Sequence, residues 1–303
     1  MERLSTISKH LNTNKTSAKN APKSPNDVVI CGAVRTPLTK AKRGGLKDTT
    51  PEILLKAVLE GLVKKTGVKA ADIQDMVFGN VSQPGAGVFP ARMSSLLSGI
   101  PDTVPCASVN RLCSSGLEAC ATIASKIRAG FIDIGVGGGV EQMTMFDMQS
   151  SLDPEKISEA VFDHPQARNT LLSMGQTSEN VAEKFGISRE KQDKMAVESH
   201  RKAFEAQKKG LYDEEIVPVQ TIQKDAEGKI KEVTISKDDG IRPETTFEGL
   251  QKLKPAFKKD GTTTAGNSSQ VNNLLPLVSV LIIFSITGHR WCCRCLARQK
   301  IHR

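Results

Sequence analysis

Hydrophobic and polar positions follow one another along the first half of the chain as they do in layered α/β proteins. Residues 28–34 form a continuous apolar run, which predicts a strand buried on both faces. Residues 51–66 repeat apolar side chains at helical spacing, and Gly67 ends the repeat. The same signals predict further strands over 73–81 and 133–141 and a helix over 91–97. Alternating strands and helices of this kind predict an α/β fold class.

Around Cys113 the sequence combines a short strand, a sharp turn and a helix. Ala107 and Val109 alternate with polar neighbours, as in a strand. Ser115 and Glu118 have the spacing of a capping box, which predicts that a helix begins there. Cys113 would then precede the positive end of a helix, where unpaired N–H groups stabilise a thiolate.

Two interpretations of Cys113 are open at this point. A strand-to-helix turn exposes the tip of a nucleophile, which favours a catalytic role. A free cysteine is more often a small buried hydrophobe, which favours a structural role. The helix that follows should end near Gly130, and its apolar repeat predicts a buried stripe of Leu117, Ala121, Ala124 and Ile127.

After Met143 the chain becomes polar. Residues 144–255 predict helices near 178–185 and 188–209, together with a hairpin turn at 224–228. An excursion of this length inside a layered domain indicates an insertion, and insertions beside a site usually shape a substrate pocket.

The charge of the chain is concentrated at its ends. The formal net charge is +9, with five Lys/Arg against one acid in residues 1–24 and five against none in residues 274–303. The balanced body between them argues against a nucleic-acid groove. The glycines at 135 and 137–139 lack dinucleotide-binding spacing, and they predict instead a close approach of another backbone or a ligand.

The number and placement of the cysteines indicate the redox environment of the protein. The seven cysteines are an odd number, and four of them lie in apolar periodic segments, which predicts a reducing environment. The first twenty residues contain no apolar stretch of the kind found in secretory signals.

Five stretches of the chain occur in the order of one family. The first reads Asn-Arg-Leu-Cys-Ser-Ser-Gly-Leu, the last reads Gly-Thr-Thr-Thr-Ala-Gly-Asn-Ser-Ser-Gln, and the five lie at 110–117, 137–144, 174–180, 239–243 and 261–270. They resemble the thiolases, specifically the degradative 3-ketoacyl-CoA thiolases of peroxisomes. The resemblance covers about residues 27–272 and implies a layered αβαβα fold, of which this chain carries the first half plus an inserted loop domain. It also implies a homodimer.

The resemblance assigns the catalytic role to Cys113. This residue matches the cysteine that attacks the 3-keto carbon, releases acetyl-CoA and passes the shortened acyl group from a thioester to free CoA. Its backbone N–H, at the helix start, would help to hold an oxyanion. Ser173 stands where biosynthetic relatives carry histidine, which favours the degradative branch.

The resemblance also implies a CoA site. Met174 matches a loop residue beside the pantetheine arm, and Arg242 matches a residue near the nucleotide end of CoA. Ser269, with Ala265 and Gly266, matches the segment that lies against pantetheine. CoA and 3-ketoacyl-CoA are thus expected as substrates, with no cofactor and no metal. Without the resemblance, residues 261–270 would be interpreted as a polar loop and Arg242 as a surface salt-bridge partner.

Residues 1–26 are expected to form a flexible targeting arm. Their start, with Arg3, Leu4, His10 and Leu11, resembles the N-terminal peroxisomal targeting nonapeptide. The sequence therefore predicts a peroxisomal location and an import receptor that recognises these four residues. The alternative is an ordinary basic N-terminus.

The resemblance stops after Gln270. The Gly-His-Pro histidine, the Asn-Glu-Ala-Phe segment and the Cys-x-Gly-x-Gly cysteine of the family's second half have no match in residues 271–303. We therefore expect a thiolase that lacks its C-terminal half. The alternative function is a catalytically inactive fragment that acts only as a binding or dimerising remnant.

The tail is interpreted as sequence from a retained intron, a frameshift or an alternative transcript, and a membrane anchor and a zinc site are the alternatives. Its apolar run, residues 274–286, is short of the about 20 residues that span a bilayer, so membrane anchoring is disfavoured. Its three cysteines lack the paired spacing of a zinc site. The expected organisation is an arm at 1–26, an N-terminal α/β half at 27–143, a loop domain at 144–255, a return segment at 256–273 and a non-family tail at 274–303.

Overall fold

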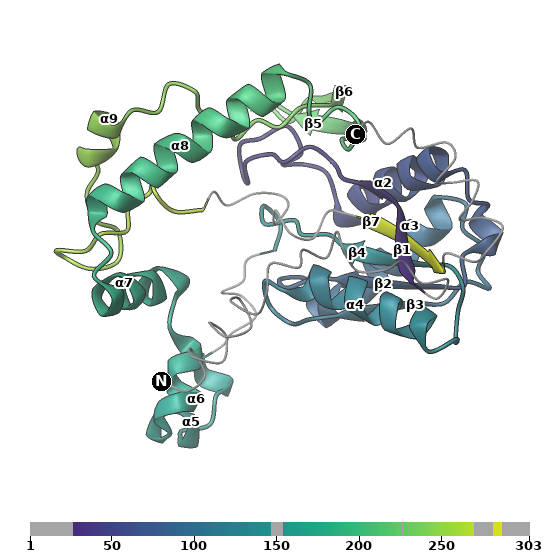
Figure 1. The fold of residues 1–303 in the computed structure, drawn as a ribbon, viewed down its shortest axis with the longest axis horizontal. Coiled ribbons are helices and arrows are strands. Elements are labelled where there is room, and N and C mark those ends of the chain that lie inside the picture. Colours follow the sequence, from purple (N-terminus) through teal and green to yellow (C-terminus); the bar gives the residue numbers. More distant parts are fainter. Residues whose placement is uncertain (1–26, 147–153, 226, 270–280, 287–303) are drawn as a thin grey trace.

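A five-stranded mixed sheet forms the core of the α/β half in the computed structural model, which describes residues 27–146, 154–225 and 227–269 and the backbone of 281–286 (Figure 1). The strand order is β1-β7-β4-β2-β3. β2 pairs in parallel with β3 and β4, whereas β7 is antiparallel to β1 and β4. The strands are β1 Val28–Val34, β2 Asp75–Gly79, β3 Cys106–Val109, β4 Gly135–Gly139 and β7 Leu281–Ile286.

Helices cover both faces of this sheet. α2 (Pro51–Thr66) and α3 (Val88–Leu97) pack on one face, and α4 (Ser115–Arg128) packs on the other. Because side chains alternate along a strand, Met76 and Phe78 of β2 join the core under α2, while Val77 joins the core under α4. The described part of the half at 27–143 is thus a three-layered α/β unit.

The predicted helix over 51–66 is confirmed. Gly67 ends α2 in a left-handed conformation at φ 70°, and its N–H donates to the carbonyl of Val63. Leu54, Leu55, Val58, Leu59 and Leu62 are buried. This buried face is wide because α2 packs against α3 as well as against the sheet.

The buried face of α4 differs from the prediction. Leu117 and Ala121 point outward, and Leu117 is 67% exposed. The fully buried side chains are Ala119, Ile123 and Ile127. The predicted stripe was therefore wrong at two positions, because the rotation of the helix is set by its contact with β4.

That contact brings the backbone of β4 against the backbone of α4 at Gly137 and against a side chain of α4 at Gly135. A Cβ atom on Gly137 of β4 would lie 2.9 Å from the Cα atom of Cys120, and one on Gly135 would lie 2.8 Å from Ile123. The expected close approach at these glycines is confirmed, and the neighbour is α4.

One expectation about β1 is corrected, and the structure adds a strand that was not predicted. β1 was predicted to be buried on both faces, but Ile30 is 54% exposed because β1 lies at the edge of the sheet. No strand was predicted within residues 274–303, where Leu281–Ile286 form β7 between β1 and β4. A six-residue strand suits part of an apolar run that is too short for a bilayer.

The insertion carries most of the remaining elements. The helices expected near 178–185 and 188–209 and the hairpin are confirmed. α7 begins earlier than predicted because Ser173 forms a capping box with Gln176. The elements are α5 Ala160–Asp163, α6 Pro165–Arg168, α7 Met174–Phe185, α8 Arg189–Lys208, β5 Val219–Lys224, β6 Ile230–Ile235 and α9 Phe247–Gln251. Short 3-10 helices lie at Ala70–Asp72, Pro84–Gly87, Pro154–Lys156 and Asn169–Leu171.

Charged groups fasten the insertion to the α/β half. The Arg35 guanidinium donates to both carboxylate oxygens of Asp238 at 2.8 and 2.9 Å and to Glu215 at 2.7 Å. Asp239 accepts the backbone N–H groups of Lys40 at 2.8 Å and Gly45 at 3.1 Å. The chain after β1 is therefore shaped by residues about 200 positions later.

Across residues 27–146, 154–225 and 227–269, no helix is both long and apolar enough to cross a membrane. Within the same described ranges, no group of three or more His, Cys, Asp or Glu side chains is placed to hold a metal ion. The tail cysteines and the proposed targeting residues Arg3, Leu4, His10 and Leu11 lie outside the described residues.

Candidate functional site

Cys113 lies in the turn between β3 and α4, and its side chain is exposed. The preceding residue, Leu112, has φ 50°, one of three positive φ values among non-glycine residues that the structure describes. A side chain other than glycine in this region is strained, and such strain is typical of functional turns. The predicted strand, turn and helix around Cys113 are confirmed.

Neighbouring side chains hold this turn in place. Asn110 Oδ1 accepts the N–H of Leu112 at 3.0 Å, and Asn110 Nδ2 donates to the carbonyl of Val81 at 3.1 Å. Ser115 Oγ accepts the N–H of Arg111 at 2.8 Å. Sequence reasoning missed Asn110, although asparagine is a common turn residue that bonds its own backbone two positions on.

The predicted capping box is wrong in its contacts. α4 begins at Ser115, so the residue at the cap position is Ser114, whose side chain makes no cap bond. The Ser115 hydroxyl closes the turn instead, and the carboxylate of Glu118 pairs with the Arg111 guanidinium. The serine–glutamate spacing therefore located the helix start, but both side chains bind the turn that carries Cys113.

The turn is pressed against the end of β2. A Cβ atom on Gly79 would lie 2.4 Å from the carbonyl carbon of Ser115, so only glycine fits there. Glu141 is buried and accepts the N–H groups of Val81 at 2.9 Å and Ser82 at 3.2 Å. Because Asn110 binds the carbonyl of Val81, Glu141 supports the cysteine turn through this loop.

Burial separates Cys113 from the other described cysteines. Cys31 is buried, and Cys106 and Cys120 are partly buried. Burial raises the pKa of Cys106 to about 11 and the pKa of Cys120 to about 11. Of these four described thiols, Cys113 is the exposed one, which supports the nucleophile interpretation over that of a buried hydrophobe.

A second feature is a pocket of about 310 Å³ between α8 and two later segments. Four residues of the expected CoA site, Arg242, Ala265, Gly266 and Ser269, line it together. The remaining lining comes from one face of α8 and from the turn near residue 267, namely Met195, Ala196, Ser199, His200, Asn267 and Ser268.

His200 is a lining residue that sequence reasoning missed. Its Nδ1 accepts the backbone N–H of Arg242 at 3.2 Å, which requires a deprotonated Nδ1. Burial and the nearby Arg242 charge lower the pKa of His200, while Glu244 opposes them. His200 is therefore neutral at neutral pH, and Arg242 supplies the positive charge of the pocket.

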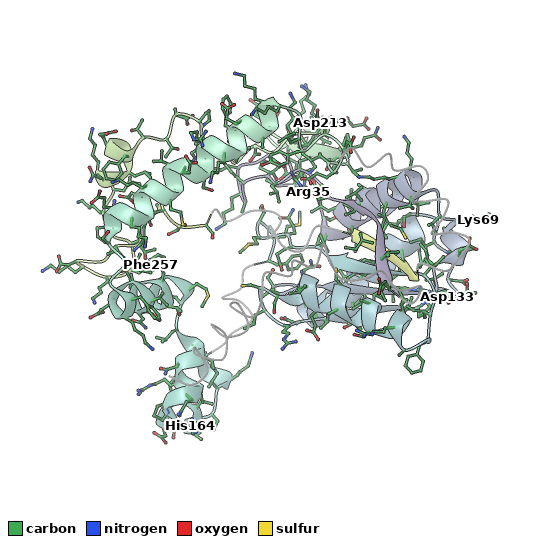
Figure 2. All side chains as sticks on the ribbon, viewed as in Figure 1. Arg35, Lys69, Asp133, His164, Asp213 and Phe257 are labelled. Carbon is green, nitrogen blue, oxygen red and sulfur yellow. The ribbon has the colours of Figure 1, made fainter. Side chains whose placement is uncertain are left out.

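Met174 does not line this pocket. It is the first residue of α7, and its side chain is exposed. The next residue, Gly175, lies against the ring of Phe257, where a Cβ atom would come within 2.2 Å of the ring. Phe257 is labelled beside α7 in Figure 2. The structure thus gathers four of the six expected site residues and leaves Cys113 and Met174 on separate elements.

The fold and the cysteine turn place this chain in a family. A family model described as the thiolase N-terminal domain matches residues 28–273. The chain belongs to the thiolase family. Its α/β unit is the thiolase-like fold that the sequence resemblance implied.

Curated relatives are similar over most of this chain. It is 52% identical to the peroxisomal 3-ketoacyl-CoA thiolase of Homo sapiens over 250 residues, which cover 82% of this chain and 58% of that protein. It is 46% identical over 275 residues to the peroxisomal 3-ketoacyl-CoA thiolase of Yarrowia lipolytica, covering 90% of this chain and 66% of that protein. The chain thus spans well under the full length of these relatives.

Solved structures agree in fold. The dimeric peroxisomal thiolase of Saccharomyces cerevisiae superposes with a TM-score of 0.77 at 38% identity, covering 88% of this chain and 66% of that chain. Human mitochondrial 3-ketoacyl-CoA thiolase, solved in complex with CoA, gives a TM-score of 0.70 at 29% identity. The match covers 86% of this chain and 64% of that chain.

Proposed function

We propose that this chain takes part in acyl transfer between 3-ketoacyl-CoA and CoA, with Cys113 as the residue that carries the acyl group. The observation that supports the proposal is the placement of Cys113. It is exposed in a strained turn, directly before a helix whose N–H groups stabilise an anion.

The proposed chemistry has two steps. In the first step the Cys113 thiolate adds to the 3-keto carbon, and the C2–C3 bond breaks. Acetyl-CoA leaves with the bonding electron pair and takes up a proton, while the shortened acyl group stays on sulfur as a thioester. In the second step the CoA thiolate adds to this thioester and Cys113 leaves as a thiolate. N–H groups at the start of α4 would stabilise the oxyanion in both steps.

Acyl transfer onto Cys113 can be tested without full turnover. The purified chain is incubated with acetyl-CoA, and the peptide spanning residues 112–126 is sequenced by mass spectrometry. We expect acetylation at Cys113 and none at Cys120, which lies in the same peptide and is partly buried. The Cys113→Ser variant is the control. An unmodified Cys113, or equal labelling of both cysteines, would refute the proposed role.

The pocket beside α8 is the proposed CoA site. Arg242 would face the phosphates at the nucleotide end, and Ala265, Gly266 and Ser269 would lie along the pantetheine arm together with Met174. One cationic and several small or hydroxylated residues in one pocket support this assignment. CoA enters this reaction as a substrate, and no resident cofactor or metal is part of the proposal.

A peroxisomal location is proposed with this activity. The curated relatives from Homo sapiens and Yarrowia lipolytica are both named as peroxisomal enzymes. Arg3, Leu4, His10 and Leu11 would supply the signal for the import receptor. The test is a fluorescent fusion of the full chain: punctate peroxisomal signal is expected, with loss of that signal when Leu4 and His10 are replaced by Ala.

A second candidate function is subunit association. α3 exposes an apolar stripe of Phe89, Met93 and Leu96, and Phe89 is 72% exposed. The neighbouring strand β3 lies at the edge of the sheet, which offers unpaired backbone groups to another chain. The proposed occupant is a second copy of this chain, in line with the dimeric yeast thiolase of the same fold.

This pairing is tested by sedimentation of the full chain. We expect a homodimer for the native sequence and a monomer for Phe89→Asp. The matched control is Phe131→Asp, since Phe131 is 80% exposed but follows α4 on another part of the surface. If both variants stay dimeric, or both become monomeric, the α3 stripe is not the contact.

A further inference from the structure

One wall of the pocket is the turn of residues 264–268, and a single side-chain amide closes this turn. Asn267 Oδ1 accepts the N–H of Thr264 at 2.7 Å. The N–H of Gly266 donates to Thr264 Oγ1 at 3.2 Å, and Ser268 Oγ donates to the Thr264 carbonyl at 2.6 Å. The shape of the wall therefore depends on how the Asn267 amide is oriented.

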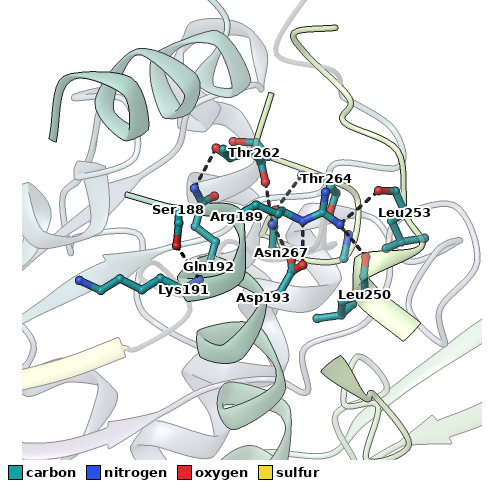
Figure 3. Close-up of polar contacts among 12 residues, drawn as sticks. Ser188, Arg189, Lys191, Gln192, Asp193, Leu250, Leu253, Thr262, Thr264 and Asn267 are labelled. Atoms are coloured by element: carbon teal, nitrogen blue, oxygen red, sulfur yellow. Dashed lines mark hydrogen bonds and ion pairs between the residues drawn. The ribbon is translucent and has the colours of Figure 1, made fainter. Parts of the chain in front are cut away.

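A buried carboxylate fixes that orientation. Asn267 Nδ2 donates to Asp193 Oδ1 at 2.9 Å and to the carbonyl of Thr262 at 2.9 Å (Figure 3). The Asp193 side chain is fully buried, and its other oxygen accepts from Arg189 Nε at 2.7 Å. Because a carboxylate only accepts, it holds the amide with its NH₂ group toward α8 and its oxygen toward Thr264.

The same carboxylate orients an arginine that reaches α9. Arg189 Nη2 donates to the carbonyls of Leu250 at 2.6 Å and Leu253 at 3.1 Å. The side chains of these two leucines press on the turn from outside, where a Cβ atom on Gly266 would lie 2.5 Å from each. Asp193 thus links the turn to the end of α9 as well as to α8.

Asp193 also shares a helical face with the opposite wall. Ala196 and His200 follow it by three and seven residues on α8, so all three lie on one side of the helix. Ala196 and His200 line the pocket, whereas Asp193 does not. One buried group beneath the pocket therefore connects both of its walls.

We infer that Asp193 is a positioning residue of the pocket: through Asn267 it sets the turn at residues 264–268 and thereby the affinity of the pocket for its ligand. The identity of the ligand, CoA, rests on the proposed function. The contacts that carry the inference are independent of that function.

The test reverses the polarity of the Asp193–Asn267 bond. Asn267→Asp places two carboxylates about 2.9 Å apart, so the turn should be displaced and binding of desulfo-CoA should weaken at least about tenfold at pH 7.5. The double variant D193N/N267D restores one amide–carboxylate hydrogen bond and should return the affinity to within about threefold. Desulfo-CoA lacks the reactive thiol, so calorimetry measures binding alone.

A matched control separates positioning from general stability. Asp238 is another buried carboxylate of the insertion, but its described contacts are with Arg35 and Leu38. Asp238→Asn should lower the thermal midpoint and leave the desulfo-CoA affinity within about twofold. Equal weakening by Asn267→Asp and Asp238→Asn, or no recovery in the double variant, would overturn the inference.

A readout without ligand completes the test. Amide hydrogen exchange at Thr264 should become faster in Asn267→Asp and slower again in the double variant, because the Thr264 N–H loses and regains its acceptor. If the native chain does not bind desulfo-CoA, the proposed CoA site fails, and the exchange at Thr264 alone decides the inference. Unchanged exchange in all variants refutes it.

Discussion

Selective alkylation of Cys113 is the most direct consequence of the cysteine placements. Burial raises the pKa values of Cys106 and Cys120 to about 11, so at pH 8 about one molecule in a thousand carries a thiolate at either position. Partial burial also limits the access of a reagent. Iodoacetamide should therefore modify Cys113 about a hundredfold faster than Cys106 or Cys120.

Peptide mapping resolves these thiols. Cleavage after Lys and Arg leaves Cys113 and Cys120 in residues 112–126 and Cys106 in residues 93–111, and fragment ions distinguish the first two. Raising the pH from 8 to 9 should increase labelling of the slow pair about tenfold, because their thiolate fraction rises by that factor. Labelling in urea gives the unprotected rates, and Cys113→Ser is the negative control.

One result would refute the reasoning. If Cys106 or Cys120 is labelled in the native chain at the rate of Cys113, burial does not separate the thiols, and the turn before α4 does not present its cysteine selectively. If Cys113 is alkylated as slowly as Cys106 and Cys120, the turn that carries Cys113 is covered in solution.

Three further predictions concern stability in urea. Gly79→Ala directs a Cβ atom at the backbone of α4 and should lower the free energy of unfolding by about 3 kcal/mol. Gly99→Ala faces open space and should lower it by about 1 kcal/mol, because its backbone is left-handed. Equal losses in the two variants would contradict the steric argument. Ile123→Ala should lower the free energy of unfolding by about 3 kcal/mol, because Ile123 is fully buried. Leu117→Ala should lower it by less than about 0.5 kcal/mol, because Leu117 is exposed. The reverse order would show that the buried face of α4 is assigned wrongly. Burial alone would raise the pKa of Glu179, but N–H donors from the facing turn outweigh it and lower the pKa. Its stabilising contribution is thus present above the ordinary value of 4.5 and lost as the pH falls through the folded-state pKa, so the deficit of Glu179→Gln should shrink from pH 7 to pH 4.

Except for β7, the strands and helices of the α/β half were predictable from the sequence because each has a local signal. Apolar runs located β1, β2 and β4, and Gly67 marked the end of α2. The rotation of α4 was not predictable, because it depends on close backbone contact with the glycines of β4. A helical pattern of small apolar residues fits several rotations equally well, and only the neighbouring strand selects one.

The candidate site was predictable in its residues but not in its support. The position of Cys113 before a helix followed from local spacing, and the family resemblance supplied Arg242 and Ser269. The contributions of Asn110, Glu141 and Asp193 come from contacts between distant segments, which no local pattern contains. These buried polar contacts are what the structure adds.

The ion pair between Arg35 and Asp238 has a consequence for folding during synthesis. The two residues are 203 positions apart, and Asp239 reaches back 199 positions to Lys40. At ribosomal rates, the segment after β1 therefore waits roughly 10 to 40 s for the residues that shape it. During that interval its apolar strand is exposed beside an unfinished loop, where an aggregating neighbour or a chaperone can bind it. The segment after β1 is thus synthesised early but is among the last to reach its final form. Slower translation of residues 40–238 should lengthen the time for which this segment depends on chaperones.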